Sequence, residues 1–357
     1  MRILVRGTNW IGDAVMTIPA MRRLRGAFPD AHIALHCRKW AEGIFRDADF
    51  LDEIITFQTG DKGLNDLRSE ASQIRRGNFD VAVLFPNSFR SAALPWLGKI
   101  PRRFGYEKEM RGFMLTDRVA VPKWKSTRHE VFYYLNLVDA VIGSLEGHAD
   151  ARNAPADISI TVSSTRRDQA REILEKLGGD PGLPIVALGC GSTNSRAKRW
   201  PAERFAALAS QIMDSAGANI VLLGSEDERD VAEDVIGLSD RNLINAVGRT
   251  SLDEAVALLA VSDVFVSNDM GLAHIAAAVG TPTLVIFGPT DPGTTRPFSD
   301  VAEVIRVPVE CSPCMLRECP IDHRCMTSIE PAAVAERVLA VLKLEKSNAR
   351  KNQSNGQ

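Results

Sequence analysis

The chain has 357 residues, of which 45% are hydrophobic and 25% charged, with a formal net charge of -2. This composition excludes a mainly disordered chain, and the length favours two domains over one. The amino terminus carries no signal-peptide pattern, no window approaches the roughly 20 apolar residues that span a bilayer, and the six cysteines do not spread as a disulfide framework would. We therefore expect a cytoplasmic protein.

The first half alternates short apolar runs with longer amphipathic stretches, which is typical of parallel strands joined by helices. The pattern predicts strands at residues 3–6, 32–36, 53–56 and 80–85, and helices at residues 14–26, 64–76 and 130–142. Residues 143–157 are small and polar and indicate an inter-domain linker. We assign the first domain to residues 1–150.

The segment GTNWIGDAV, residues 7–15, directly follows the first predicted strand. Asp13 begins a helix there, and its carboxylate is suited to accept the proton of an attacking hydroxyl. A helix N-terminus stabilises the ionised carboxylate and so lowers its basicity, unless burial offsets this effect. The alternative is a plain N-cap.

The stretch between Arg90 and Arg128 is basic, with ten Lys and Arg against three Asp and Glu. Such a stretch suits an anionic substrate or a membrane surface with anionic headgroups. The alternative is a solvated charged face.

The second half repeats the alternation. It predicts strands at residues 185–188, 219–223, 243–245, 264–267 and 283–287, a second domain over residues 158–344, and a polar, disordered tail over residues 345–357. The expected fold is therefore α/β, with two doubly wound, Rossmann-like domains facing a cleft. Ligands should lie beyond the carboxyl ends of the strands.

Residues 264–289, VFVSNDMGLAHIAAAVGTPTLVIFGP, predict a strand, a tight turn, a helix and a second strand. Asp269 and Gly271 fall at the turn, and the helix begins near Leu272. Unpaired N–H groups at a helix start hold phosphates without a metal, and Gly271 permits close approach of a diphosphate. The alternatives are a capping role for Asp269 and a buried structural role for His274.

A second loop, residues 189–208, follows a predicted strand and contains hydroxyl and amide side chains together with a lysine: Thr193, Asn194 and Lys198. These residues are suited to line a phosphate pocket, although no complete phosphate-binding motif occurs. Glu226 follows the next strand, where doubly wound domains often place an acid for ribose hydroxyls. A merely solvated Glu226 is the alternative.

Cys311, Cys314, Cys319 and Cys325 lie within fifteen residues, together with His323. A zinc site is one interpretation of this stretch. Reduced thiols packed in a loop explain it adequately and are the favoured interpretation, because the spacing differs from the two separated pairs of common zinc modules. We expect neither a metal nor a cofactor in the reaction.

Taken together, several segments resemble the lipopolysaccharide heptosyltransferases of glycosyltransferase family 9, particularly the type II enzymes. The resemblance covers roughly residues 1–343. Its specific parts are NWIGDAVMTIPAMRRLR, LFPNSFRSAALPW, AKRWPAERF, SNDMGLAHIAAAVGTPTLVIFGPTDP and the cysteine-rich stretch. The resemblance implies the GT-B type of fold, with an acceptor-binding first domain and an ADP-heptose-binding second domain. It also implies inverting transfer of L-glycero-D-manno-heptose onto the inner-core heptose of nascent lipopolysaccharide, on heptosyl-Kdo2-lipid A.

By position in these motifs, the resemblance gives Asp13 the role of general base and Lys198 the charge that meets the diphosphate. It implies that the donor site is lined by Asp269, Gly271, Leu272 and His274. Met270 stands where some relatives have Thr, so a side-chain hydroxyl contact is lost at that position. On the acceptor side we expect Asn87, Ser88, Arg90 and Arg111, the last reaching a phosphate or a Kdo carboxylate of the anionic glycolipid.

The expected partners are ADP-heptose, the lipopolysaccharide acceptor and the inner membrane surface, with no nucleic acid. Three alternatives stay open. The first is a heptosyltransferase of type I or III that acts at another core position. The second is a nucleotide-sugar epimerase of the same fold, which needs no acceptor. The third is a two-domain solute-binding protein, although such proteins usually carry an export signal.

Overall fold

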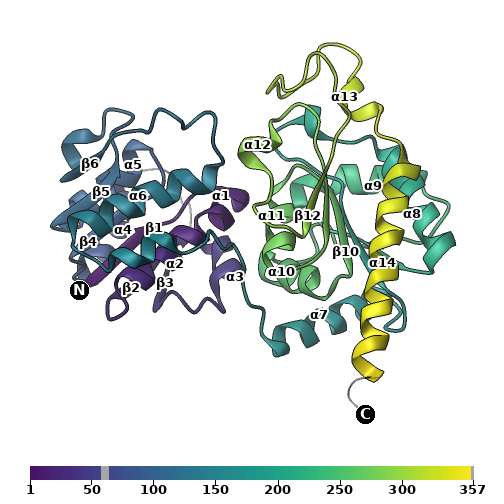
Figure 1. The fold of residues 1–357 in the computed structure, drawn as a ribbon, viewed down its shortest axis with the longest axis horizontal. Coiled ribbons are helices and arrows are strands. Elements are labelled where there is room, and N and C mark those ends of the chain that lie inside the picture. The colour runs from purple at the N-terminus through teal and green to yellow at the C-terminus, as the bar shows by residue number, and fades with distance from the viewer. Residues whose placement is uncertain (58–63, 355–357) are drawn as a thin grey trace. The chain divides into compact units, whose positions relative to one another are not determined.

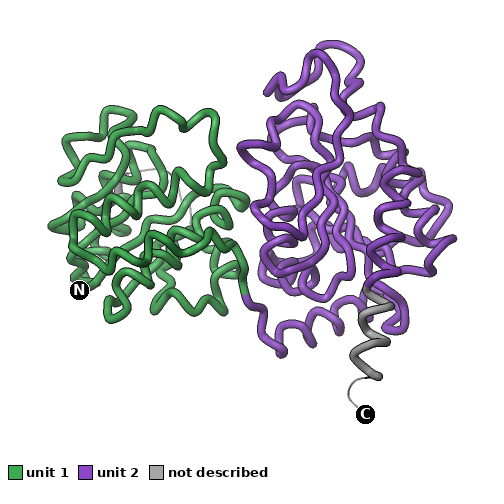
Figure 2. Tube along the Cα trace, in the orientation of Figure 1, with its two compact units in different colours: residues 1–160 green, residues 161–357 purple. Residues whose placement is uncertain are grey.

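The computed structural model describes residues 1–57 and 64–354. The chain divides into two compact units between Ile160 and Thr161 (Figure 2). The boundary therefore lies a few residues later than the sequence predicts. Arg22 donates to the carbonyl of Ser159 over 2.8 Å and Arg23 to that of Ala154 over 3.1 Å, which fastens the predicted linker to the first unit.

The first unit contains a six-stranded, fully parallel sheet with the order β3-β2-β1-β4-β5-β6 (Figure 1). The strands are β1 (Arg2–Arg6), β2 (His32–Arg38), β3 (Glu53–Phe57), β4 (Val81–Leu84), β5 (Arg102–Tyr106) and β6 (Asp117–Val119). The first four confirm the predicted strands to within two residues at each end. The sequence did not predict β5 and β6, because two arginines and a glycine interrupt β5, and β6 has only three residues at the sheet edge.

The α-helices of the first unit are α1 (Ile11–Met16), α2 (Ile18–Ala27), α3 (Glu42–Phe45), α4 (Leu64–Arg76), α5 (Phe89–Leu97) and α6 (Glu130–Ser144). The single helix predicted over residues 14–26 is two helices, because Pro19 lacks the N–H needed to continue α1 and instead occupies the first turn of α2. On one face of the sheet, α4 and α5 bury apolar side chains against Leu4, Ala82 and Leu84.

The second unit repeats the architecture, with the strand order β12-β11-β10-β7-β8-β9 and parallel pairing throughout. The strands are β7 (Ile185–Gly189), β8 (Asn219–Leu222), β9 (Ile244–Asn245), β10 (Val264–Asn268), β11 (Thr283–Ile286) and β12 (Ala302–Ile305). Five of these six confirm predicted strands. The sequence did not predict β12, a half-polar strand at the sheet edge.

The α-helices of the second unit are α7 (Ser164–Lys176), α8 (Ala202–Ala216), α9 (Arg229–Leu238), α10 (Leu252–Val261), α11 (Gly271–Ala278), α12 (Pro292–Thr295), α13 (Arg324–Thr327) and α14 (Pro331–Ser354). Helices α8, α9 and α14 bury apolar side chains against one face of the sheet, in the core that contains Leu188, Leu222 and Val266. Helix α10 contacts both α7 and α11.

Helix α14 extends to Ser354, whereas the sequence predicts a disordered tail from residue 345. The added residues include the good helix formers Ala, Arg, Lys and Gln, and the first glycine after Leu344 is Gly356. Residues 355–357 lie outside the described residues. In the part of the chain that the structure describes, no helix combines the length and apolarity needed to cross a bilayer.

The two sheets share a topological feature that positions the functional loops. In the first unit the chain moves from β1 outward to β2 and β3 and then returns to β4 on the other side of β1, so β1 and β4 flank the switch point. In the second unit β7 and β10 flank the equivalent point. Ligands of doubly wound sheets bind beyond the carboxyl ends of the strands at such points.

Candidate active site

The candidate functional residues form two half-sites, one at the switch point of each unit. In the first unit the loop after β1 leads to Asp13, and the loop after β4 contains Asn87 and Ser88. In the second unit the loop after β7 leads to Lys198, and Asp269 directly follows β10. The sequence therefore predicted the loops at both switch points correctly.

Asp13 lies in the first turn of α1, and the N-cap residue is Trp10, so the carboxylate is not the cap. It accepts a hydrogen bond from the hydroxyl of Tyr134 on α6, over 3.3 Å. Burial raises the pKa of the Asp13 carboxyl from its ordinary 3.8 to about 6. The Glu130 carboxylate adds to this rise, whereas the Tyr134 hydrogen bond and the Lys125 ammonium oppose it. Burial thus offsets the acidifying effect of the helix start.

Tyr134 is buried, and this burial, together with the nearby carboxylates of Asp13 and Glu130, raises the pKa of its hydroxyl well above 10. The phenol therefore stays protonated and acts as the donor to Asp13. Lys125 forms an ion pair with Glu130 and lies 4.5 Å from the ring centroid of Tyr133. A buried donor, an anion and a cation thus surround the Asp13 carboxylate.

The same helix connects Asp13 to the loop after β4. The Asn87 amide donates to the Tyr133 hydroxyl over 3.2 Å, and the Tyr133 ring stacks on Tyr106 at a centroid distance of 4.1 Å. The chain has only three tyrosines, and all three belong to this network. Sequence reasoning missed Tyr133 and Tyr134, although two adjacent tyrosines in an otherwise apolar helix were a usable signal.

Arg111 does not occupy the position that the sequence predicts for it. Its side chain is fully buried (0% exposed), and burial lowers the pKa of its guanidinium to about 10. It donates twice to the Tyr106 carbonyl, and also to the Pro86 carbonyl, the Ser91 hydroxyl and the Asn87 amide oxygen. All five N–H groups are therefore used. The prediction that Arg111 reaches an acceptor anion is wrong, because the residue instead holds the loop that contains Asn87.

Two other predicted acceptor residues also have structural partners. Ser88 caps α5 by accepting the N–H of Ser91 over 3.4 Å, and Arg90 pairs with the buried Glu70 over 2.6 Å. Ion pairs also involve Arg102, Arg118 and Lys125 of the basic stretch. The exposed cations of that stretch are Lys99, Lys108, Arg118, Lys123 and Arg128, of which Arg118 is paired with Glu107.

In the second unit Lys198 and Asp269 form an ion pair with 2.6 Å between Nζ and Oδ2. The Thr290 hydroxyl donates to the same carboxylate oxygen over 2.8 Å. The side chain of Asp269 is 8% exposed and that of Lys198 is 27% exposed. The ammonium is thus fixed in place, while part of the Lys198 side chain stays exposed. Sequence reasoning missed Thr290, which lies within the segment GPTDP of the resemblance motif.

Asn268 sets the spacing between these two loops. Its side-chain oxygen accepts the N–H of Trp200 over 2.9 Å, and its amide donates to the carbonyls of Cys190 and Gly191 over 2.8 and 3.1 Å. Asn268 is fully buried, so these bonds tie the end of β10 to the loop after β7. Lys198, two residues before Trp200, is thereby held next to Asp269.

Helix α11 begins at Gly271, and its N-cap is Met270, which makes no side-chain capping bond. Asp269 is therefore not a cap, and the first N–H groups of α11 keep the capacity to bind an anion. The Met270 side chain packs over the backbone of Gly189, where a Cβ atom would lie 2.8 Å from its sulfur. The side chains of Leu272 and His274 are buried, so a ligand meets this helix through its backbone.

The remaining predicted donor residues are exposed. Thr193 and Asn194 lie in the loop after β7. Glu226 pairs with Arg229 over 2.7 Å, and its side chain is 62% exposed. The buried acid of that loop is Glu228, which completes a capping box with Ser225. The structure thus places Glu226 at the surface and gives Glu228 a structural role.

The alternative zinc site receives no support from the geometry. Within residues 1–57 and 64–354, no three His, Cys, Asp or Glu side chains are arranged to hold a metal ion. All six cysteines are free thiols, and the Nε2 atom of His323 lies 2.6 Å from the carbonyl oxygen of Ala197.

Comparisons with known proteins give matches over most of the chain. The sequence model of glycosyltransferase family 9 (heptosyltransferase) matches residues 67–324. A lipooligosaccharide heptosyltransferase 2 of Haemophilus ducreyi is 31% identical over 86% of this chain and 89% of its own. Lipopolysaccharide heptosyltransferase 2 of Escherichia coli K12 is 29% identical over 86% of this chain and 88% of its own.

A solved structure of E. coli ADP-heptose LPS heptosyltransferase II superposes with a TM-score of 0.82. It is 28% identical, and the match covers 97% of this chain and all of that one. Both doubly wound units are therefore those of the GT-B type of glycosyltransferase.

Proposed function

Because the chain belongs to glycosyltransferase family 9, the heptosyltransferases, we propose that it transfers L-glycero-D-manno-heptose from ADP-heptose to lipopolysaccharide. The acceptor that we propose is the inner-core heptose of heptosyl-Kdo2-lipid A, and the similarity to lipopolysaccharide heptosyltransferases of type 2 supports it. The family match over most of the chain carries this proposal. We further propose that the enzyme works in the cytoplasm at the inner membrane surface.

The first half-site supports a general-base role for Asp13. An acceptor hydroxyl attacks the anomeric carbon of the heptose while the bond from that carbon to the diphosphate oxygen breaks. The hydroxyl proton passes to the Asp13 carboxylate, and the bonding electrons leave with ADP. A base with a pKa of about 6 is ionised at neutral pH and is a stronger proton acceptor than an ordinary carboxylate. A single displacement of this kind inverts the anomeric configuration.

The second half-site supports stabilisation of the leaving group. Negative charge grows on the diphosphate as the glycosidic bond breaks, and preorganised positive groups lower the energy of that transition state. The Lys198 ammonium is held by Asp269, and α11, with the N–H groups of its first turn, begins two residues after Asp269. We propose that these groups replace a divalent cation in the reaction.

The deciding experiment measures release of ADP from ADP-heptose, with and without a heptosyl-Kdo acceptor, in the presence of a chelator. We expect release only with the acceptor, and unchanged release with the chelator. Release of ADP without transfer, or epimerised donor without any acceptor, would favour an epimerase. Strict dependence on a divalent metal would contradict the role of Lys198 and α11. Linkage analysis of the product separates the type II position from those of types I and III.

A further inference from the structure

Three exposed aromatic side chains gather on the first unit. The ring centroid of Phe113 lies 6.1 Å from that of Phe89 and 6.4 Å from that of Trp96. These side chains are 62%, 51% and 46% exposed, respectively. In the described part of the chain only one other aromatic side chain, Trp10, is exposed to this degree. Single exposed apolar residues are common, but a contiguous aromatic cluster marks an interaction surface. We call Phe89, Trp96 and Phe113 the aromatic patch.

The patch is held on an ordered framework. Phe89 and Trp96 lie on α5, and Phe113 lies on the short 3-10 helix Gly112–Met114. The residue before that short helix is Arg111, whose five hydrogen bonds fasten it to the interior. The three exposed rings therefore lie on helical segments, and the segment that carries Phe113 is anchored to the interior through Arg111.

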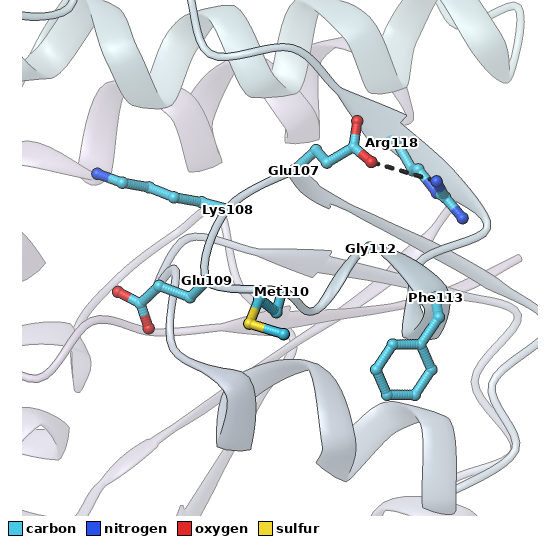
Figure 3. A pocket seen from close by; sticks show the side chains of 7 residues that line it. All are labelled: Glu107, Lys108, Glu109, Met110, Gly112, Phe113 and Arg118. Atoms are coloured by element: carbon cyan, nitrogen blue, oxygen red, sulfur yellow. Dashed lines mark hydrogen bonds and ion pairs between the residues drawn. The ribbon is translucent and has the colours of Figure 1, made fainter.

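Few charged side chains lie around the patch, and their net charge is slightly positive. An open hollow of about 410 Å³ lies beside Phe113, and Glu107 at its edge pairs with Arg118 over 3.2 Å. Figure 3 shows the lining side chains, with Lys108 and Glu109 extending away from the ring. Lys99 follows α5 and is also exposed. The summed formal charge of the side chains around the patch is +1, from three cations and two anions: Lys99, Lys108 and Arg118, and Glu107 and Glu109. The side chains that line this hollow are of mixed charge. The feature that marks this face as an interaction surface is therefore the aromatic patch and not the hollow.

The patch is also continuous with the first half-site. Phe89 is the first residue of α5, directly after Asn87 and Ser88, and Arg111 donates to Asn87 over 3.2 Å. Under the proposed function, on which this step rests, the acceptor sugar is attached to a lipid embedded in a bilayer. We infer that the aromatic patch is the surface by which the first unit inserts into the interface of the membrane that holds its acceptor.

The chemistry favours a bilayer over a protein partner. Aromatic side chains concentrate at membrane interfaces, and single anchors of this size bind reversibly, as an enzyme that moves between lipid-linked acceptors requires. The weak net positive charge adds a modest attraction to anionic headgroups. Insertion of the rings should therefore provide most of the binding, and salt should weaken it only slightly.

The test uses the full chain and co-sedimentation with vesicles of phosphatidylcholine containing phosphatidylglycerol. We expect the double variant Trp96→Ser/Phe113→Ser to partition at least about tenfold more weakly than the wild type, because two rings no longer enter the interface. Leu238→Ser is the matched control, since Leu238 is 58% exposed on α9 of the second unit. The control should bind the vesicles like the wild type.

Activity separates this inference from the proposed function. The double variant should lose turnover on a vesicle-embedded acceptor but keep it on a delipidated, water-soluble core oligosaccharide. Unchanged vesicle binding by the double variant would overturn the inference, as would a wild-type chain that self-associates through the patch and ignores vesicles. Failure of the wild type on the soluble acceptor would instead count against the proposed function. Thermal melts of both variants exclude unfolding as the cause.

Discussion

The hydroxyl of Tyr134 lies 3.3 Å from Oδ1 of Asp13 and donates a hydrogen bond to it, which links α6 to α1. This bond lowers the pKa of the carboxyl while burial and Glu130 raise it, and the balance falls at about 6. A carboxylate with that pKa is ionised at neutral pH and binds a proton more tightly than an ordinary carboxylate does. The contacts around Asp13 therefore set its basicity, and each contact can be tested separately.

Replacing Asp13 with Asn should reduce kcat by about 10²- to 10⁴-fold, the range typical of a lost general base. The amide retains an oxygen that accepts from Tyr134, so the local packing should survive. Calorimetric titration with ADP should give nearly the wild-type affinity, because Asp13 belongs to the other unit from Lys198 and α11. Equal losses in kcat and ADP affinity would show a structural role.

In the pH profile of kcat, the value should decrease below a pH of about 6, because Asp13 becomes protonated there. This decrease is the acid limb of the profile. Tyr134→Phe removes the bond that lowers the pKa of Asp13, so this limb should move to higher pH. Glu130→Gln removes an anion that raises this pKa, so the limb should move to lower pH. Tyr133→Phe is the control, because Tyr133 bonds to Asn87 and should leave the limb in place. Shifts in the same direction for both test variants would refute this assignment.

The raised pKa of Asp13 also has a consequence for stability. A carboxyl whose pKa rises from 3.8 to about 6 on folding stabilises the fold when protonated, and this contribution is lost as the pH rises through about 6. At pH 7 the Asp13→Asn variant should therefore exceed the wild type in free energy of unfolding by about 1–3 kcal/mol. Below pH of about 4 the difference should vanish. Chemical denaturation at both pH values measures it, and a less stable variant at pH 7 would contradict the burial of this charge.

The sequence predicted the fold well where strands are buried and apolar, as in β1 and β10. It missed β5, β6 and β12, because arginines, glycine or a half-polar edge obscure the apolar pattern there. The strand pattern also located the four loops that contain the candidate site residues, since parallel strands bring their carboxyl ends to one edge.

The orientation of individual side chains could not be predicted from the sequence. A basic stretch predicted that Arg111 faces an anion, yet no periodicity shows that its guanidinium turns inward and makes five hydrogen bonds to four acceptors. The same limit hid Tyr134, which meets Asp13 across 121 positions of sequence. Glu226 and Glu228 stand two residues apart, and only the folded structure shows that Glu228 is the buried acid, packed against Gly191 and bonded to Ser225.

The ion pair of Lys198 and Asp269 can be separated into a structural and a functional part. Lys198→Ala should weaken ADP binding about ten- to hundredfold, because one charge-assisted contact is lost. It should also lower the free energy of unfolding by about 1–3 kcal/mol, less than for a fully buried pair, because the Lys198 side chain is 27% exposed.

The double variant Lys198→Ala/Asp269→Asn removes the unpaired carboxylate that the single variant leaves. Its stability should return toward that of the wild type, since the amide can still accept from Thr290, whereas ADP binding should stay weak. Urea denaturation and calorimetric titration measure the two quantities independently. Recovery of ADP affinity in the double variant would show that Lys198 only neutralises Asp269.

Arg111→Lys tests whether this guanidinium is a structural anchor or an acceptor ligand. Lysine keeps the charge but offers three donors in place of five, so at least two of the five buried hydrogen bonds are lost. We expect the free energy of unfolding to fall by about 2–4 kcal/mol. Arg90→Lys is the matched control, because a lysine can keep the single ion pair with Glu70, and it should change stability by less than about 1 kcal/mol. If Arg111→Lys instead raised KM for the acceptor at unchanged stability, Arg111 would bind the acceptor anion after all, and the loop containing Asn87 would need another anchor.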